Sequence, residues 1–97
     1  MEIQQSDEGN KGFFKAMDNA AEAGVMAYTW KSPNVIAILY TEVNPSFAGK
    51  NIGKQLVMAS VKYARENDIK IIPFLCSFAK SIFEKDTEIQ DVLFKAS

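Results

Sequence analysis

Gly49-Lys50-Asn51-Ile52-Gly53-Lys54 joins a nearly continuous apolar run, 35–43, to a segment with helical periodicity, 52–67. This junction decides the fold, because a strand, a glycine-containing turn and a helix start follow one another there. The first N–H groups of a helix lack intrahelical partners and carry the positive end of the helix dipole, so such a turn is a natural place to bind phosphate. The glycines permit positive φ or close approach of a ligand, and the lysines add positive charge.

The motif alone does not identify a ligand. A Gly-x-x-x-Gly spacing is equally typical of an ordinary helix start. The stretch is not a Walker A loop, because the Gly-Lys-Ser/Thr spacing is absent, and it is not the Gly-x-Gly-x-x-Gly dinucleotide fingerprint. A phosphate site and a plain helix start are therefore both open at this point.

The length and the net charge of the chain limit the class of protein to which it can belong. The 97 residues suit one domain, predicted to span 1–97. A formal net charge of −1 gives no global reason to expect a nucleic acid or an anionic membrane as partner. No apolar run approaches the roughly 18 residues of a membrane span, and the polar N-terminus is unlike a secretory signal. A cytoplasmic location is the default expectation.

The chain has one cysteine, Cys76, and no histidine. An intrachain disulfide is therefore excluded, and we expect no metal site of the zinc type. Serine-histidine and cysteine-histidine catalysis lack their base. Any catalysis must rely on carboxylates, tyrosine, lysine, cysteine, water or backbone groups.

The apolar and β-branched runs predict strands separated by turns at 18–22 and 32–34. The expected strands cover 3–5, 11–17, 25–31, 35–43, 69–75 and 91–95. The fourth is expected to be central and buried on both faces, and Pro73 marks an edge or an interruption in the fifth.

Two helices complete the prediction. The first spans 52–67, and Ser77 is expected to cap a second, short one whose apolar pairs are Phe78/Ile82 and Ala79/Phe83. We expect Phe78, Ile82 and Phe83 to be core. The predicted fold class is α+β, an antiparallel N-terminal meander followed by a strand-helix-strand-helix unit with a parallel crossover.

Several short motifs follow one another in a distinctive order: Tyr40-Thr41-Glu42-Val43-Asn44-Pro45, Gly49-x-x-x-Gly53-Lys54-x-Leu56, Tyr63-Ala64-Arg65 and Cys76-Ser77-Phe78. With this order and spacing, the chain resembles the GNAT acyltransferase superfamily, in particular its small single-domain, YjdJ-type branch. The resemblance covers most of residues 24–95 and implies a GNAT-like mixed sheet.

The resemblance implies that acetyl-coenzyme A is the cosubstrate and that no metal is needed. The pyrophosphate would lie on backbone N–H groups of Gly49, Lys50, Asn51, Ile52, Gly53 and Lys54. The pantetheine arm would pair with the exposed strand end formed by Thr41, Glu42 and Val43. The reaction would be attack by a neutral amine, either a small molecule or a peptide, whose identity the sequence does not give.

The sequence departs from the family pattern at three positions. Asn51 stands where the loop has its middle glycine, although asparagine tolerates the left-handed conformation better than other non-glycine residues. Ala48 replaces a polar Arg or Gln ahead of the loop. Tyr40 replaces a histidine and is expected in the core or in a pocket wall.

Two residues are candidates for catalysis. Glu42 is the best candidate for a base, and its alternative is an ordinary solvated strand-end carboxylate. Cys76 would protonate the leaving thiolate or accept the acyl group transiently, and its alternative is a small buried hydrophobe. Trp30 is expected to pack on the sheet, with an acceptor groove as the alternative.

Two functions follow from these residues. The first is acetyl-CoA-dependent N-acetylation of an amine. The second is a coenzyme-A-binding or protein-interaction module with little or no catalysis, which the replacements Ala48, Asn51 and Tyr40 favour. A protein-binding module without a nucleotide ligand is a third possibility.

Overall fold

The computed structural model describes residues 1–95, so the last two residues of the predicted 1–97 domain lie outside the described range. One five-stranded sheet holds its strands in chain order. They are β1 (Glu2–Asp7), β2 (Lys11–Asp18), β3 (Ala21–Ser32), β4 (Val35–Val43) and β5 (Lys70–Ile72). The first three pairings are antiparallel and β4 pairs with β5 in parallel. The predicted α+β order of meander and strand-helix-strand-helix unit is confirmed.

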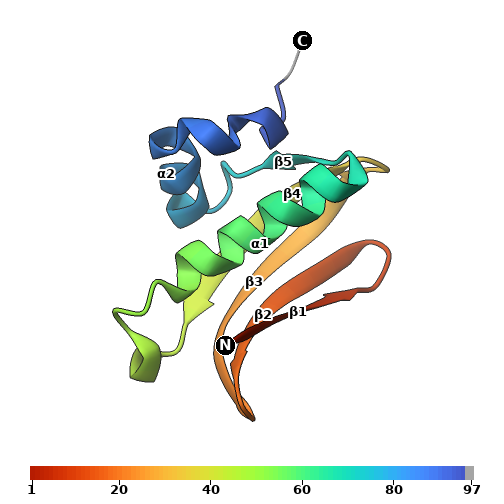
Figure 1. Cartoon of the computed structure of the whole chain (residues 1–97). Helices are drawn as coiled ribbons and strands as arrows, with labels where there is room; N and C mark the ends of the chain where they lie inside the picture. Colours follow the sequence, from red (N-terminus) through yellow and green to blue (C-terminus); the bar gives the residue numbers. More distant parts are fainter. Residues whose placement is uncertain (96–97) are drawn as a thin grey trace.

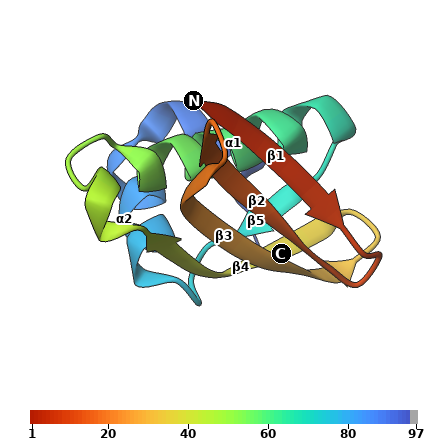
Figure 2. The same ribbon diagram turned by 90° about the horizontal axis from the view of Figure 1, so that it is seen from below.

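The helices lie against one face of the sheet (Figure 1). They are α1 (Ile52–Asn67), α2 (Ser77–Lys85) and the 3₁₀ segments η1 (Pro45–Phe47) and η2 (Thr87–Val92). In the view from below, β1, β2 and β3 lie in front, and α1, α2 and β5 lie behind them (Figure 2). No helix within residues 1–95 is long and apolar enough to cross a membrane.

The buried side chains of α1 recur at helical spacing and lie on the side that faces the sheet. Ile52, Leu56, Val57, Val61 and Ala64 are all buried on the sheet. The polar group within this face is satisfied locally, because the hydroxyl of Ser60 donates to the carbonyl of Val57 at 2.6 Å. The backbone of β3 comes close to α1 at Gly24, where an added Cβ would lie 2.8 Å from Ile52 Cγ2.

Strands β4 and β5 pair only briefly and then separate. The ladder runs from Val35↔Lys70 to Ala37↔Ile72. On its other side, β4 carries a bulge, because Tyr28 pairs with Ile38 and Ala27 with Tyr40, which leaves Leu39 as the extra residue. From Ile38 onward, one edge of β4 therefore has no strand partner among the described residues.

Two expectations for these strands are wrong. The 69–75 strand is shortened to Lys70–Ile72, because Pro73 has no N–H to donate and the chain turns towards α2. Strand β4 is buried on both faces only from Val35 to Ile38, whereas Leu39 and Tyr40 are exposed. The exposure of Leu39 and Tyr40 follows from the separation of the two strands beyond Ala37 and Ile72.

The C-terminal strand expected at 91–95 is also wrong. Its first residues belong to η2, where the carboxylate of Asp86 accepts from the Glu88 N–H at 3.0 Å and Ile89 and Val92 are buried. A single parallel bridge, Ile71↔Leu93, is what remains of the expected pairing.

The start of α2 differs from the expectation as well. Cys76 occupies the N-cap position and its side chain makes no capping bond, so Ser77 is not the cap. Phe83 is buried and Ile82 half-buried, but Phe78 is 41% exposed rather than core. Its ring packs on the start of α1, where a Cβ on Gly53 would meet Phe78 Cζ at 2.8 Å.

Candidate functional site

The glycine turn is built from two residues with positive φ. Gly49 has φ +85°, and Asn51 adopts the left-handed conformation at φ 57° and ψ 32°. The tolerance expected of asparagine at this position is confirmed. Asn51 is also the N-cap of α1, but its side chain makes no capping hydrogen bond. The first N–H groups of α1 therefore lack a side-chain acceptor from their own cap.

The segment before the turn is fixed to the beginning of β3. The Asn44 N–H donates to the Ala23 carbonyl at 2.8 Å, and its side-chain amide donates to the Glu22 carbonyl at 3.3 Å. The side-chain oxygen of Asn44 accepts from the Ser46 N–H at 3.0 Å. The end of β4 and the start of the turn are thereby held in one arrangement.

A cavity of about 430 Å³ opens between this turn and α2. Six of the predicted coenzyme residues line it: Val43, Gly49, Asn51, Ile52, Gly53 and Lys54. The other three, Thr41, Glu42 and Lys50, are not among the lining residues, and the Lys50 ammonium lies 5.3 Å from the centroid of the Phe47 ring.

Sequence reasoning missed several residues of this cavity. Its remaining lining residues are Asn44, Pro45, Phe47, Ala48, Phe78 and Ile82. The Asn-Pro pair directly after a strand is a turn signal that points to the first two. Phe78 and Ile82 carry no such signal, because apolar residues spaced by four on a short helix are equally typical of core.

Thr41 and Cys76 meet across the gap between β4 and α2. The hydroxyl oxygen of Thr41 lies 3.6 Å from the sulfur of Cys76. Since consecutive side chains of a strand point to opposite faces, Glu42 lies on the face away from Cys76. The two predicted catalytic residues therefore lie near the same strand end but on opposite sides of the sheet.

Cys76 is a free thiol with 7% exposure. It belongs to the buried cluster that also contains Ala79 and Phe83. Its N–H donates to the Pro73 carbonyl at 3.1 Å and its carbonyl accepts from Lys80 at 2.9 Å. The sulfur is thus fixed at the start of α2, with Thr41 as its polar neighbour.

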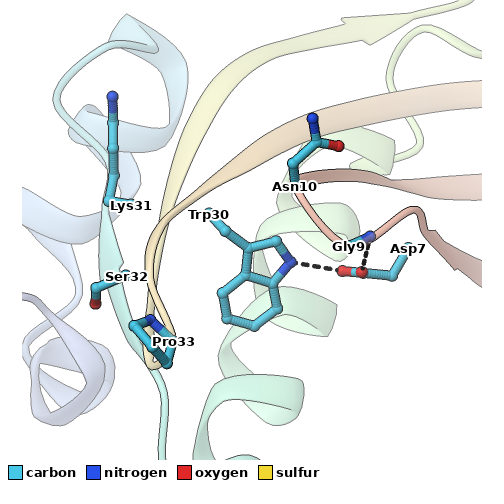
Figure 3. A pocket seen from close by; sticks show the side chains of 7 residues that line it. All are labelled: Asp7, Gly9, Asn10, Trp30, Lys31, Ser32 and Pro33. Atoms are coloured by element: carbon cyan, nitrogen blue, oxygen red, sulfur yellow. Dashed lines mark hydrogen bonds between the residues drawn. The ribbon is translucent and has the colours of Figure 1, made fainter.

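A second cavity, of about 490 Å³, lies at the opposite end of the sheet, and its lining includes Asp7, Asn10, Trp30 and Pro33. Figure 3 shows the carboxylate of Asp7 accepting hydrogen bonds from the Trp30 indole and the Gly9 N–H. Trp30 pairs with Ile36 at one end of the β3–β4 ladder, whereas Glu42 lies near the other. Trp30 therefore lines a cavity, but not one beside Thr41 or Glu42.

The Asp7 carboxylate is also bonded to Tyr28, whose hydroxyl donates to it at 2.5 Å. Burial alone would raise the pKa of Asp7, but the hydrogen bonds from Tyr28, Gly9 and Trp30 outweigh it and lower the pKa. The tyrosine ring reaches β1 by passing over Gly12 of β2, where a Cβ would lie 2.4 Å from Tyr28 Cζ. This contact links β1 to β3 across the strand between them.

Within residues 1–95, no group of three or more His, Cys, Asp or Glu side chains is placed to hold a metal ion. The groups found at the site are the backbone N–H groups of the turn, the Cys76 thiol, the Thr41 hydroxyl, the Glu42 carboxylate and the Lys54 ammonium.

Comparison with known proteins agrees with this geometry. A family profile described as GCN5-related N-acetyl-transferase matches residues 12–92. A GCN5-like candidate N-acetyltransferase from Staphylococcus aureus, solved by NMR, is similar over 99% of this chain and 90% of its own, with 36% identity and a TM-score of 0.71. No curated protein matches the chain.

Two more distant structures share the fold. The aminoglycoside N-acetyltransferase AAC(6')-Iy, in complex with CoA, has 14% identity and a TM-score of 0.61 over 98% of this chain and 92% of its own. The aminoglycoside acetyltransferase meta-AAC0020, from an uncultured soil sample, has 17% identity and a TM-score of 0.63 over 94% of this chain and 67% of its own. With its profile match and its similarity to the staphylococcal protein, the chain belongs to the GCN5-related N-acetyltransferase family.

Proposed function

We propose that this protein transfers the acetyl group of acetyl-CoA to the nitrogen of a primary amine. The observation that carries the proposal is the glycine-turn cavity, which lies beside an unpaired strand edge and a thiol–hydroxyl pair. Family membership supports acyl transfer, and the presence of CoA in the related AAC(6')-Iy fold supports the choice of coenzyme.

The glycine turn is suited to the coenzyme's pyrophosphate. Gly49 and Asn51 in left-handed conformations turn the backbone so that α1 begins directly at the cavity. Its first N–H groups and the dipole of a helix of 16 residues attract an anion there. Lys54 lines the same cavity and adds a positive charge.

The open edge of β4 is suited to the pantetheine arm and to the reacting carbonyl. Beyond Ala37, the strand keeps its extended form, and no strand within residues 1–95 pairs with it on the β5 side. Its free N–H and C=O groups can pair with the amides of the arm, as they would with a strand. A backbone N–H at Thr41 to Val43 would polarise the thioester oxygen.

The proposed reaction uses the two faces of the sheet separately. The amine nitrogen attacks the thioester carbonyl on the face of Glu42, and the Glu42 carboxylate removes the proton as the C–N bond forms. The C–S bond then breaks, and the Cys76 thiol protonates the leaving thiolate on the other face. Thr41, whose oxygen lies 3.6 Å from that sulfur, holds the thiol in place.

Calorimetric titration with acetyl-CoA, followed by thiol release over a panel of amines, tests the proposal. We expect saturable binding, and turnover that falls at least about tenfold in Glu42→Gln and Cys76→Ala with binding retained. Glu66→Gln, an exposed carboxylate on α1, is the matched control. Absence of binding contradicts the proposal as a whole, and binding without thiol release leaves the coenzyme-binding module as the function.

A further inference from the structure

The exposed apolar side chains of this protein gather at one place. Of the seven large apolar side chains exposed within residues 1–95, only Met1 lies elsewhere. The other six belong to β4, to the turn between β5 and α2, and to the start of α2: Leu39, Tyr40, Val43, Phe74, Leu75 and Phe78. A cluster of exposed apolar side chains often marks a binding surface, whereas singly scattered ones need no such explanation.

The coenzyme cavity accounts for only two of the six. Val43 and Phe78 line the cavity at the glycine turn, whereas the other four do not. These four, Leu39, Tyr40, Phe74 and Leu75, are here called the apolar rim. The most exposed side chains of the rim are Phe74, at 56%, and Leu75, at 60%.

The apolar rim flanks the gap between the two parallel strands. Its residues follow the last ladder pair, Ala37↔Ile72, by two or three positions on each chain. One position further along, Thr41 and Cys76 come within 3.6 Å. The rim therefore borders the point at which the proposed reaction takes place, and it is continuous with that site.

The charges of the two segments restrict what the rim can bind. Segments 38–43 and 73–78 contain a single charged side chain, Glu42. One carboxylate can balance one ammonium group, which gives its first proton to water before it attacks as the neutral amine, but a polyamine would bring further charges onto an apolar surface without a counterion. Charge complementarity thus favours a ligand with one amine and an apolar remainder.

We propose that the acceptor is a small primary monoamine whose carbon chain or ring packs on the apolar rim while its nitrogen faces Glu42. This inference rests on the proposed function and specifies the substrate class. Apolar contact of this kind contributes equally to the ground state and the transition state, so it lowers KM and leaves kcat nearly unchanged.

Two amine comparisons test the substrate class. In the series of n-alkylamines from propyl to hexyl, we expect kcat/KM to rise with each methylene, by up to about fourfold where the group is fully buried. n-Hexylamine should exceed 1,6-diaminohexane, which has the same length and a second charge, by at least about tenfold. A flat series, or preference for the diamine, would overturn the inference.

Substitutions in the apolar rim test whether the rim causes the dependence of kcat/KM on chain length. Phe74→Ser with Leu75→Ser should remove the chain-length dependence by raising KM, whereas Phe74→Leu with Leu75→Ile should retain it. Both rim variants should keep the pyrophosphate site, because the rim lies outside the glycine-turn cavity, and the KM for the amine is measured at saturating acetyl-CoA so that a weaker contact with the pantetheine arm does not enter. Unchanged KM in the serine variant contradicts the assignment.

A readout without turnover separates this inference from the proposed function. In the CoA-saturated protein, n-hexylamine should shift the NMR signals of Phe74 and Leu75 saturably, and the diamine should do so far more weakly. Such shifts without acetyl transfer would support the rim while contradicting catalysis. Absence of shifts, or a dimer that the serine variant abolishes, would assign the surface to another occupant and overturn the inference.

Discussion

Asp7 illustrates how a single exposed carboxylate can determine part of the architecture. It accepts from Tyr28, Trp30 and Gly9 at 2.5, 2.8 and 2.8 Å. Burial raises the pKa of Tyr28, and its bond to Asp7 raises it further. The tyrosine therefore remains a donor and Asp7 a charged acceptor at neutral pH, which is the strongest combination for a bond between two strands.

Replacement of this carboxylate should make the free energy of unfolding less dependent on pH in the acid range. Because folding lowers the pKa of Asp7, its contribution is complete above the unfolded value, about 3.9, and is lost as the pH falls through the folded value. We expect Asp7→Asn to lower the free energy of unfolding by about 1 kcal/mol at neutral pH, discounted for exposure.

Urea unfolding at a series of pH values measures this effect. The difference between Asp7→Asn and the parent protein should vanish in acid, and the neighbouring Glu8→Gln should show no such difference. A constant difference at every pH would show that the charge of Asp7 is not what stabilises the fold.

At the scale of elements, the turn between β4 and α1 depends on backbone conformation more than on side chains. Asn51 has φ 57° and no capping bond from its side chain. A residue with a Cβ pays conformational energy there, roughly 1–2 kcal/mol for one without a short polar side chain. The helix start is therefore sensitive to which residue type stands at this position.

Asn51→Gly and Asn51→Ala should consequently differ. We expect the alanine variant to be about 1 kcal/mol less stable than the glycine variant, although alanine is the better helix former. Acetyl-CoA affinity should be retained in the glycine variant and lowered in the alanine variant, as measured by calorimetry. Similar stability and affinity in the two variants would mean that the turn relaxes to another conformation.

The elements that the sequence predicts well are those with local signals. The 52–67 helix has buried residues at helical spacing, and its predicted bounds agree with α1. The first four strands were placed by their apolar and β-branched runs, with ends displaced by a few residues. The left-handed Asn51 followed from its side-chain chemistry.

The elements predicted poorly depend on contacts distant in sequence. The end of β5 at Ile72 had a local signal in Pro73, but the exposure of Leu39 and Tyr40 reflects the separation of β4 from β5, which no local pattern encodes. The segment 91–95 has a strand-like composition, but burial of Ile89 and Val92 favours a 3₁₀ helix there. Asp86, which caps this helix, is a residue type typical of a helix start. Phe78 has the composition of a core residue, and only the proximity of Gly53 reveals its position at the cavity.

At the scale of the whole molecule, the candidate site joins parts that are far apart in the chain. The end of β4, the start of α1 and the start of α2 meet around the glycine-turn cavity. A ligand in this cavity would contact all three and bind only the folded chain. Coenzyme binding should therefore stabilise the molecule as a unit.

Thermal unfolding with acetyl-CoA measures this linkage. At a ligand concentration of 100 times Kd, the expected gain is about 2.7 kcal/mol, and each kcal/mol raises Tm by about 4–8 °C in a protein of this size. Acetyl-pantetheine, which lacks the pyrophosphate, should give a much smaller shift at the same concentration. Equal shifts for the two ligands would contradict a pyrophosphate site at the glycine turn.

The passage of Tyr28 over Gly12 has a consequence for how the molecule opens. Strand β1 lies at the edge of the sheet, and only Ile3 among its residues is even partly buried. Beyond the β2 ladder, side-chain hydrogen bonds attach it to β3: Asp7 accepts from Tyr28 and Trp30, and Gln5 donates to the Tyr28 hydroxyl at 3.0 Å. Acid should release this strand as a cooperative unit before the remaining sheet unfolds, and amide hydrogen exchange would report that opening as early loss of protection confined to the first hairpin.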